Sequence, residues 1–203
     1  MKKGLIIVIS GPAGSGKGTI VRTLREKMPE LGLSVSATTR DPRPGEEEGV
    51  SYYFITREEF ERRIASGEIL EHTLYCGNYY GTPKSELERI TADGRDLILE
   101  IEVNGALQIK KLFPEAVAIM LLPPDAKLLE SRLRGRGTET EEIIERRLKR
   151  AEEELKLLPN YDYLVVNGEN MIDECAEQIR AIIKAEHTRT SRMTEFADDF
   201  FAD

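Results

Sequence analysis

The sequence has few of the residues that define a disulfide framework, a metal centre or a membrane span. Its 203 residues include two cysteines, two histidines and no tryptophan. Cys76 and Cys175 can form one disulfide bridge at most. The only imidazole ligands are His72 and His187, and nothing in the sequence places the cysteines near them in a metal site. We therefore interpret both cysteines as free thiols. No segment approaches the roughly 18–20 consecutive apolar residues that cross a bilayer, so we expect no membrane partner.

The charge balance excludes another class of partner. Acidic residues number 37 and basic residues 29, which leaves a formal charge of −8 and argues against binding nucleic acid or anionic membranes over the whole surface. The apolar run from Leu5 to Ile9 is too short for a signal peptide and leads directly into a glycine-rich loop. We therefore expect a cytoplasmic protein without a nucleic-acid partner, and the pattern predicts no particular oligomeric state.

Short apolar runs alternate with charged segments of helical spacing, which is typical of an α/β protein. The runs are continuously apolar, as expected for parallel strands that helices cover on both faces. They lie at Leu5–Ile9, Leu97–Ile101, Ala116–Leu122 and Tyr163–Val166. The chain length favours one main domain with small inserted lobes.

Two stretches depart from this alternation. Residues 34–91 are rich in tyrosine, proline and glycine and are predicted to form an inserted lobe of β or mixed structure. Residues 126–150 carry a cluster of arginines and lead into a charged helix that should end near Pro159, so we interpret them as a mobile lid. The core domain is then 1–33 with 92–125 and 151–189, and residues 190–203 form a C-terminal tail that either frays or docks.

A glycine-rich loop follows the first apolar run and precedes a segment of helical spacing. This is the context that the phosphate-binding pattern G-x-x-x-x-G-K requires. Glycines let backbone N–H groups close around phosphate oxygens, and Lys17 can reach the β and γ phosphates. A glycine-rich turn without a ligand is the disfavoured alternative. The expected ATP-binding residues are Gly11, Pro12, Ala13, Gly14, Ser15, Gly16, Lys17, Gly18 and Thr19.

The loop departs from the common pattern at one position. Gly18 stands where a serine or threonine usually follows the lysine, and the hydroxyl comes one residue later at Thr19. Direct ligation of a metal by this loop is therefore not expected. Mg²⁺ is still expected as the cofactor, because the charge of the triphosphate must be neutralised and its oxygens oriented.

The predicted inserted lobe carries a candidate acceptor site. Arg40 and Arg43 lie three residues apart on a stretch that two prolines keep extended, a layout suited to binding phosphate. A solvated basic loop would be the ordinary interpretation, but Tyr52-Tyr53-Phe54, Glu71 and the segment from Gly77 to Thr82 accompany them. From Ser34 to Phe54 the sequence resembles the guanylate kinase signature SxSxTTRxPRxGExxGxxYxF.

The resemblance implies roles for individual residues. Arg40, Arg43, Tyr52 and Tyr80 would hold the phosphate of GMP, and Ser36, Glu71 and Thr82 would recognise guanine. The chemistry agrees, since one carboxylate can accept both the N1–H and the 2-amino group of guanine, whereas N1 of adenine is an acceptor. Taken alone, Glu71 could equally be an outward residue of an edge strand.

The segment Leu99-Glu100-Ile101-Glu102-Val103-Asn104-Gly105-Ala106 resembles the LEIDxxGA segment of the same family. Glu102 stands in place of the usual aspartate and is expected to contact GMP. With Thr19, Glu100 and Glu102 are the candidate metal residues, acting through water. The alternative is that one of the two carboxylates points away from the cleft.

The lid resembles RLxxRGTE followed by a later RL, and Arg132, Arg136 and Arg147 match its arginines. Arg134, Arg146 and Arg150 are interpreted as a solvated helix face. Asn167 resembles the position near the adenine of the donor, although it could equally be a turn residue after a strand.

Together the motifs predict a P-loop fold with a three-layer core, a GMP lobe and a helical lid. The expected reaction is in-line transfer of the γ-phosphoryl group of MgATP to GMP or dGMP in purine metabolism. The expected catalytic residues are Lys17, Arg40, Arg132, Arg136 and Arg147. A non-catalytic scaffolding module, a kinase for AMP or a sugar phosphate, and a GTP-dependent switch are alternatives. The complete glycine-rich loop argues against the scaffolding module. The set of Ser36, Glu71 and Thr82 argues against another acceptor, and the lack of an N-K-x-D element argues against the switch.

Overall fold

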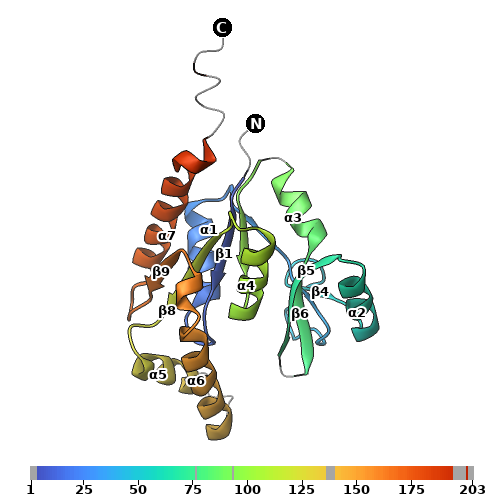
Figure 1. Ribbon diagram of the computed structural model, residues 1–203. Coiled ribbons are helices and arrows are strands. Elements are labelled where there is room, and N and C mark those ends of the chain that lie inside the picture. The colour runs from blue at the N-terminus through green and yellow to red at the C-terminus, as the bar shows by residue number, and fades with distance from the viewer. Residues whose placement is uncertain (1–3, 76, 93, 136–139, 194–199, 201–203) are drawn as a thin grey trace.

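The protein has a central parallel sheet with helices on both faces (Figure 1). The computed structural model describes residues 4–75, 77–92, 94–135, 140–193 and 200. Neighbouring strands of the five-stranded sheet all run parallel, in the order β2-β7-β1-β8-β9. The strands are β1 Ile6–Ser10, β2 Gly32–Leu33, β7 Leu97–Glu100, β8 Val117–Leu122 and β9 Tyr163–Val166. The predicted α/β class with a central parallel sheet is confirmed.

The apolar runs are continuous because successive residues enter cores on opposite faces of the sheet. Ile7 and Ile9 of β1 pack beneath α1 (Lys17–Lys27) and α7 (Ile172–His187). Ile6 and Val8 pack on the other face, with α4 (Val103–Leu112) and α3 (Lys84–Thr91). Ile7, Val8 and Ile9 are fully buried, which stabilises the fold by about 1.5–3 kcal/mol for each side chain.

One strand of this sheet is not predicted from the sequence. The two-residue edge strand β2 pairs Gly32 with Leu97 and Leu33 with Ile98. It lacks an apolar run because α3 lies against it, and a Cβ at Gly32 would stand 2.3 Å from Cγ2 of Ile90. Close approach of a helix therefore selects glycine here instead of a β-branched residue.

Residues between β2 and α3 build a second sheet of four strands in the order β4-β3-β6-β5. Its strands are β3 Ala37–Thr38, β4 Tyr53–Phe54, β5 Ile69–Tyr75 and β6 Asn78–Pro83, and α2 (Arg57–Ala65) covers it. Thr56 caps α2 by accepting the N–H of Glu59. Phe60 of α2 is fully buried and stacks on Tyr79 at 5.1 Å between ring centroids, so this lobe has a small core of its own.

Two further helices, α5 (Ala126–Arg134) and α6 (Glu141–Leu155), pack together in the lower part of Figure 1. Their contact is a separate apolar cluster of Leu129, Leu133, Ile144 and Ala151, against which Ala13 of the glycine-rich loop packs. Residues 136–139 of the predicted lid lie outside the described residues. A 3₁₀ turn at Leu158–Asn160 contains Pro159, which confirms the predicted end of the charged helix.

The remaining expectations about organisation have mixed outcomes. Cys175 is a buried free thiol, as predicted, and Cys76 lies outside the described residues. The start of the tail docks, because Arg192 donates to the buried carboxylate of Glu186 at 2.9 Å. None of the helices in the described part of the chain combines the length and apolar character that crossing a bilayer requires. The division into core, lobe and lid by residue number stays a prediction.

Candidate active site

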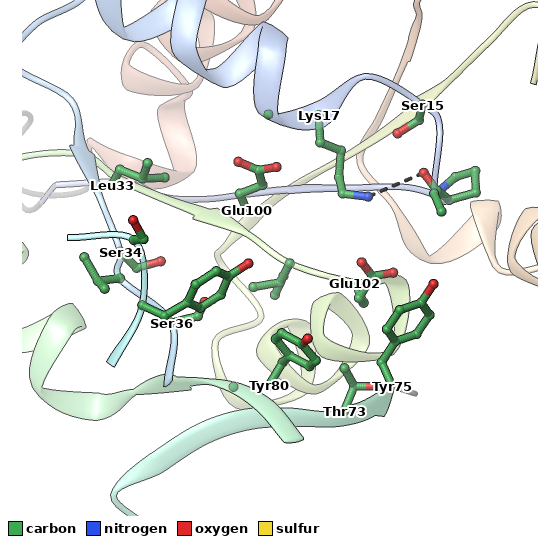
Figure 2. A pocket seen from close by; sticks show the side chains of 18 of the residues that line it. Ser15, Lys17, Leu33, Ser34, Ser36, Thr73, Tyr75, Tyr80, Glu100 and Glu102 are labelled. Atoms are coloured by element: carbon green, nitrogen blue, oxygen red, sulfur yellow. Dashed lines mark hydrogen bonds between the residues drawn. The ribbon is translucent and has the colours of Figure 1, made fainter. Parts of the chain in front are cut away.

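A cleft of about 940 Å³ lies between the central sheet and the four-stranded sheet. Figure 2 shows Ser15 and Lys17 on one side, Ser36 and Tyr80 on the other, and Glu100 and Glu102 between them. The cleft is at the carboxyl ends of β1 and β7, where ligands bind in open parallel sheets. Residues 12–19 line it, together with Ser36, Arg40, Arg43, Tyr52, Glu71 and Tyr80.

The glycine-rich loop has a backbone that only glycine adopts freely. Gly11 has φ of 152°, and a Cβ there would stand 2.2 Å from the carbonyl oxygen of Leu121. Gly16 has φ of 94° at the N-cap of α1, which turns the first N–H groups of that helix toward the cleft. The loop therefore presents positive backbone dipoles to the cleft, as an anion site requires.

Two side chains of this loop have polar atoms suited to an anion. The hydroxyl of Ser15 is buried and has no hydrogen-bond partner among the described residues. The ammonium of Lys17 donates to the carbonyl oxygens of Gly11 and, at 3.5 Å, of Pro12. A buried hydroxyl and an ammonium whose hydrogen bonds within the described part of the chain go to carbonyl oxygens both gain from a phosphate.

Asn167 supports the loop from behind. It is 3% exposed, and its Nδ2 donates to the carbonyl oxygen of Ser15 at 2.9 Å. A Cβ at Gly16 would stand 2.5 Å from the same Nδ2, so the glycine also makes room for the amide. The position predicted to lie near adenine is thus in direct contact with the phosphate-binding loop.

Arg40 is held in place by a carboxylate that sequence reasoning missed. Its two terminal nitrogens each donate to Glu46 at 2.9 Å, and its guanidinium lies 5.4 Å from the ring centroid of Tyr52. Glu46 also accepts the N–H of Arg43 at 2.7 Å. The ion pair with Arg40 lowers the pKa of Glu46 and raises that of Arg40. Nε of Arg40 stays buried without a partner among the described residues.

Glu71 is buried although β5 is an edge strand, so the alternative of an outward-facing residue is wrong. The residue is 2% exposed, and its carboxylate accepts the hydroxyl of Thr82 at 2.8 Å. Burial raises the pKa of Glu71 to about 7. A Cβ at Gly105 would stand 2.2 Å from Oε2 of Glu71. The glycine after Asn104 therefore leaves the space that this carboxylate occupies.

Glu100 and Glu102 both line the cleft, so neither points away from it. Burial raises the pKa of Glu100 against the opposing effect of Lys17. A Cβ at Gly18 would stand 3.4 Å from Oε1 of Glu100, which places this carboxylate beside the loop. The described residues contain no cluster of three metal-ligating side chains. The set fits a hydrated Mg²⁺ held largely by phosphate oxygens, as this hard cation prefers.

The lid arginines have different surroundings. Arg132 donates to the carbonyl oxygen of Gly168 at 2.9 Å, and its other terminal nitrogen is buried without a partner among the described residues. Arg147 lines the cleft with its guanidinium 5.9 Å from the ring centroid of Tyr75. Arg136 lies outside the described residues.

The predicted solvated face of the lid is right for two arginines and wrong for one. Arg134 pairs with Glu130 and Glu141 at the surface, and Arg146 is exposed. Arg150 instead lines the cleft, 5.4 Å from the ring centroid of Tyr75, and donates to Glu154 at 2.8 Å. Helical spacing brings Arg150 to the same side as Arg147, which a count of charges does not show.

Comparison with known proteins identifies the family. A sequence profile described as guanylate kinase matches residues 3–186. The chain belongs to the guanylate kinase family. The guanylate kinase of Halalkalibacterium halodurans is 50% identical over 194 residues, 96% of this chain and 94% of that protein. That of Desulfitobacterium hafniense is 48% identical over 189 residues, 93% and 94% of the two chains.

A solved structure agrees with this assignment. The crystal structure of guanylate kinase from Anaplasma phagocytophilum superposes with a TM-score of 0.75 at 35% identity, over 94% of this chain and 90% of that chain. The predicted guanylate kinase resemblance and the predicted P-loop fold are therefore confirmed. In this guanylate kinase family member, Glu46, Gly105 and Arg150 are the site residues that sequence reasoning missed. Glu46 and Gly105 had a signal, since they are the glutamate of the signature and the glycine of the LEIDxxGA segment, whereas Arg150 had none.

Proposed function

We propose that this chain transfers the γ-phosphoryl group of ATP to GMP, giving ADP and GDP, with both nucleotides in the one cleft. The observation that carries the proposal is the buried carboxylate of Glu71 in the same cleft as the loop of residues 12–19. A phosphate-binding loop alone serves many P-loop proteins, whereas a buried acceptor for two neighbouring donors suits guanine. Family membership supports the same reaction.

On the donor side, loop N–H groups and the start of α1 bind the phosphates of ATP. Lys17 exchanges the carbonyl oxygens of Gly11 and Pro12 for β and γ phosphate oxygens. Ser15 supplies a further donor from its buried hydroxyl. Glu100 and Glu102 would hold Mg²⁺ through water beside the phosphates of ATP, where the cation would supply neutralisation of phosphate charge.

On the acceptor side, Arg40 and Arg43 with Tyr52 and Tyr80 bind the phosphate of GMP. The pair with Glu46 fixes the guanidinium of Arg40, so that little side-chain entropy is lost when phosphate binds. Glu71 accepts the N1–H and the 2-amino group of guanine. The hydroxyl of Ser36 donates to O6 of guanine. The hydroxyl of Thr82 either donates to O6 as well or holds Glu71 in place through the hydrogen bond between them.

The chemical step needs no general base. A phosphate oxygen of GMP, already anionic near neutral pH, forms a bond to the γ phosphorus as the bond from that phosphorus to the β–γ bridging oxygen breaks. The lid arginines Arg132, Arg136 and Arg147 meet the charge of the transferred group and exclude water from it. A cytoplasmic location and a role in purine nucleotide metabolism stay predictions.

The test is an ADP-release assay with ATP and one acceptor at a time. GMP, AMP, CMP, UMP and ribose 5-phosphate are compared, and we expect a kcat/KM for GMP about 10⁴-fold above that for AMP. Lys17→Met serves as the matched control, because it removes the donor-side ammonium and should abolish ADP release with every acceptor. A higher kcat/KM for any other acceptor would refute the proposal.

A further inference from the structure

Glu86, in the first turn of α3, is a buried carboxylate outside the lining of the cleft. It is 1% exposed and accepts hydrogen bonds from three separate parts of the chain. Its partners are the backbone N–H of Val35 at 2.8 Å, the hydroxyl of Tyr53 at 3.0 Å and Nε of Arg89 at 3.0 Å. Burial opposes ionisation, but these hydrogen bonds outweigh it and lower the pKa of Glu86.

Two of the partners, Val35 and Tyr53, adjoin the segment that joins the two sheets, whereas Arg89 lies on α3 with Glu86. Val35 lies between β2 of the central sheet and β3 of the four-stranded sheet. Tyr53 belongs to β4, and its N–H donates to the carbonyl oxygen of Ser36 at 2.9 Å. Glu86 therefore holds the residue before Ser36 and, through the hydroxyl of Tyr53, the strand that pairs with Ser36.

This arrangement fixes a side chain that the reaction uses. Ser36 lines the cleft, and its hydroxyl reaches guanine only if the backbone on both sides keeps its place. Strand backbones hold the two ends of this segment, since the N–H of Ser34 donates to the carbonyl oxygen of Ile98 at 3.0 Å and the carbonyl oxygen of Ser36 accepts from Tyr53. Glu86 adds the contact to Val35 between them. A charged acceptor at Val35 gives a stronger and more directional bond than a neutral group would.

We propose that Glu86 is a positioning residue for guanine recognition, which acts by holding the Ser36 hydroxyl in register with the base. The inference rests on the proposed function, since it assigns Glu86 a part in reading the acceptor. Glu86 itself touches neither nucleotide. Its removal leaves the Val35 N–H without its acceptor and frees the segment to shift.

The test is a double-mutant cycle between Glu86 and Ser36, read as kcat/KM for GMP and KM for ATP. Glu86→Ala should lower kcat/KM for GMP about tenfold and leave KM for ATP within about twofold. In a Ser36→Ala background the same change should have less than about a twofold effect, because the hydroxyl it positions is gone. Glu86→Gln, which keeps an acceptor for Val35, should recover most of the loss.

Glu88→Ala is the matched control, since Glu88 lies on the same helix with its side chain 62% exposed and should change neither constant. If Glu86→Ala fails to fold, Glu86→Asp is put through the same cycle, because it withdraws the carboxylate by one methylene. An equal loss with and without Ser36, or a parallel rise in KM for ATP, would overturn the inference. Those outcomes leave GMP phosphorylation by the unmodified enzyme intact, whereas failure of the proposed function would remove it.

Discussion

Glu71 combines deep burial with a charge that guanine recognition requires. The hydroxyl of Thr82 donates to its carboxylate, and burial raises the pKa of Glu71 to about 7. A pKa near 7 means that the protonated and ionised forms of Glu71 are close in free energy at neutral pH. Guanine selects the carboxylate, because its N1–H and 2-amino group are both donors.

The first prediction concerns the pH dependence of GMP affinity. Below about pH 7 a proton must leave Glu71 on binding, so the Kd for GMP should rise up to about tenfold per pH unit. The Glu71→Gln variant has no such proton, so it should bind GMP weakly and its Kd should change less with pH. Calorimetric titration of both proteins between pH 5.5 and 8 measures the difference.

The phosphate of GMP provides the internal control, because its second ionisation near pH 6 affects both proteins alike. Parallel profiles for the two proteins would contradict the assignment.

The pH dependence of folding stability runs opposite to that of GMP affinity, because stability falls as pH rises. Because the folded pKa is raised, the stabilising contribution of Glu71 is fully present below about 4.5 and is lost as pH rises through about 7.

The second prediction separates two roles for Asn167. Asn167→Asp replaces the donor to Ser15 with an oxygen that repels its carbonyl, at a cost of about 1–3 kcal/mol to the loop geometry. KM for ATP and the inhibition constant of inorganic tripolyphosphate should both rise about tenfold, because the loop binds phosphates. If Asn167 acted only on adenine, the constant for tripolyphosphate, which has no base, would stay unchanged.

Single residues were predictable where a motif fixes their chemistry. The loop glycines, Arg40 and Glu71 follow from residue type and spacing, and all line or adjoin the cleft. The LEIDxxGA segment marks Gly105 but does not show that it leaves space beside Glu71, and Arg150 was not predictable because its role depends on its side of a helix. Such roles depend on tertiary distances that spacing in the chain does not contain.

At the scale of elements, the contact between α6 and β5 joins the predicted lid to the four-stranded sheet. Arg147 and Arg150 of α6 both approach the ring of Tyr75 at the end of β5, and Arg150 is also held by Glu154. The electron-rich ring of Tyr75 stabilises a guanidinium group at such a distance.

The third prediction tests this contact. Tyr75→Leu should lower kcat about fivefold, corresponding to about 1 kcal/mol of cation–π stabilisation, while Tyr75→Phe should stay within about twofold of the unmodified enzyme. The phenylalanine variant is the matched control because it keeps the ring and removes only the hydroxyl. Equal losses in both variants would mean that the hydroxyl, and not the ring, forms the contact.

Elements were predictable in proportion to their burial. β1, β7, β8 and β9 lie within one residue of their predicted ranges because strands covered on both faces are continuously apolar. β2, β3 and β4 have two residues each, and their pairing depends on neighbours distant in the chain. Short strands of this kind leave no periodic signal.

At the scale of the whole molecule, separate small cores allow the parts to move as units. Phe60 lies at the centre of one in the four-stranded sheet, and Leu133 belongs to another between α5 and α6. Neither core includes the apolar residues of the central sheet. The residues proposed to bind ATP and GMP line one shared cleft, so nucleotides bound on both sides can draw these parts together.

The fourth prediction is closure that needs both substrates. Small-angle scattering should show a smaller radius of gyration with GMP and a non-hydrolysable ATP analogue together than with neither. Each ligand alone should leave the radius of gyration close to that of the free protein, because the predicted lid and the four-stranded sheet would then lack one of their bridging contacts. Equal compactness in all four states would contradict closure.

The central claim is direct transfer from ATP to GMP, selected by Glu71. The measurement that tests it most directly is a competition in one tube, with ATP labelled in its γ phosphate and equal amounts of GMP, AMP, CMP and UMP. The account predicts that the label appears in GDP and that Glu71→Gln sharply reduces this preference. Label in another diphosphate, or in inorganic phosphate with GDP unlabelled, would contradict it.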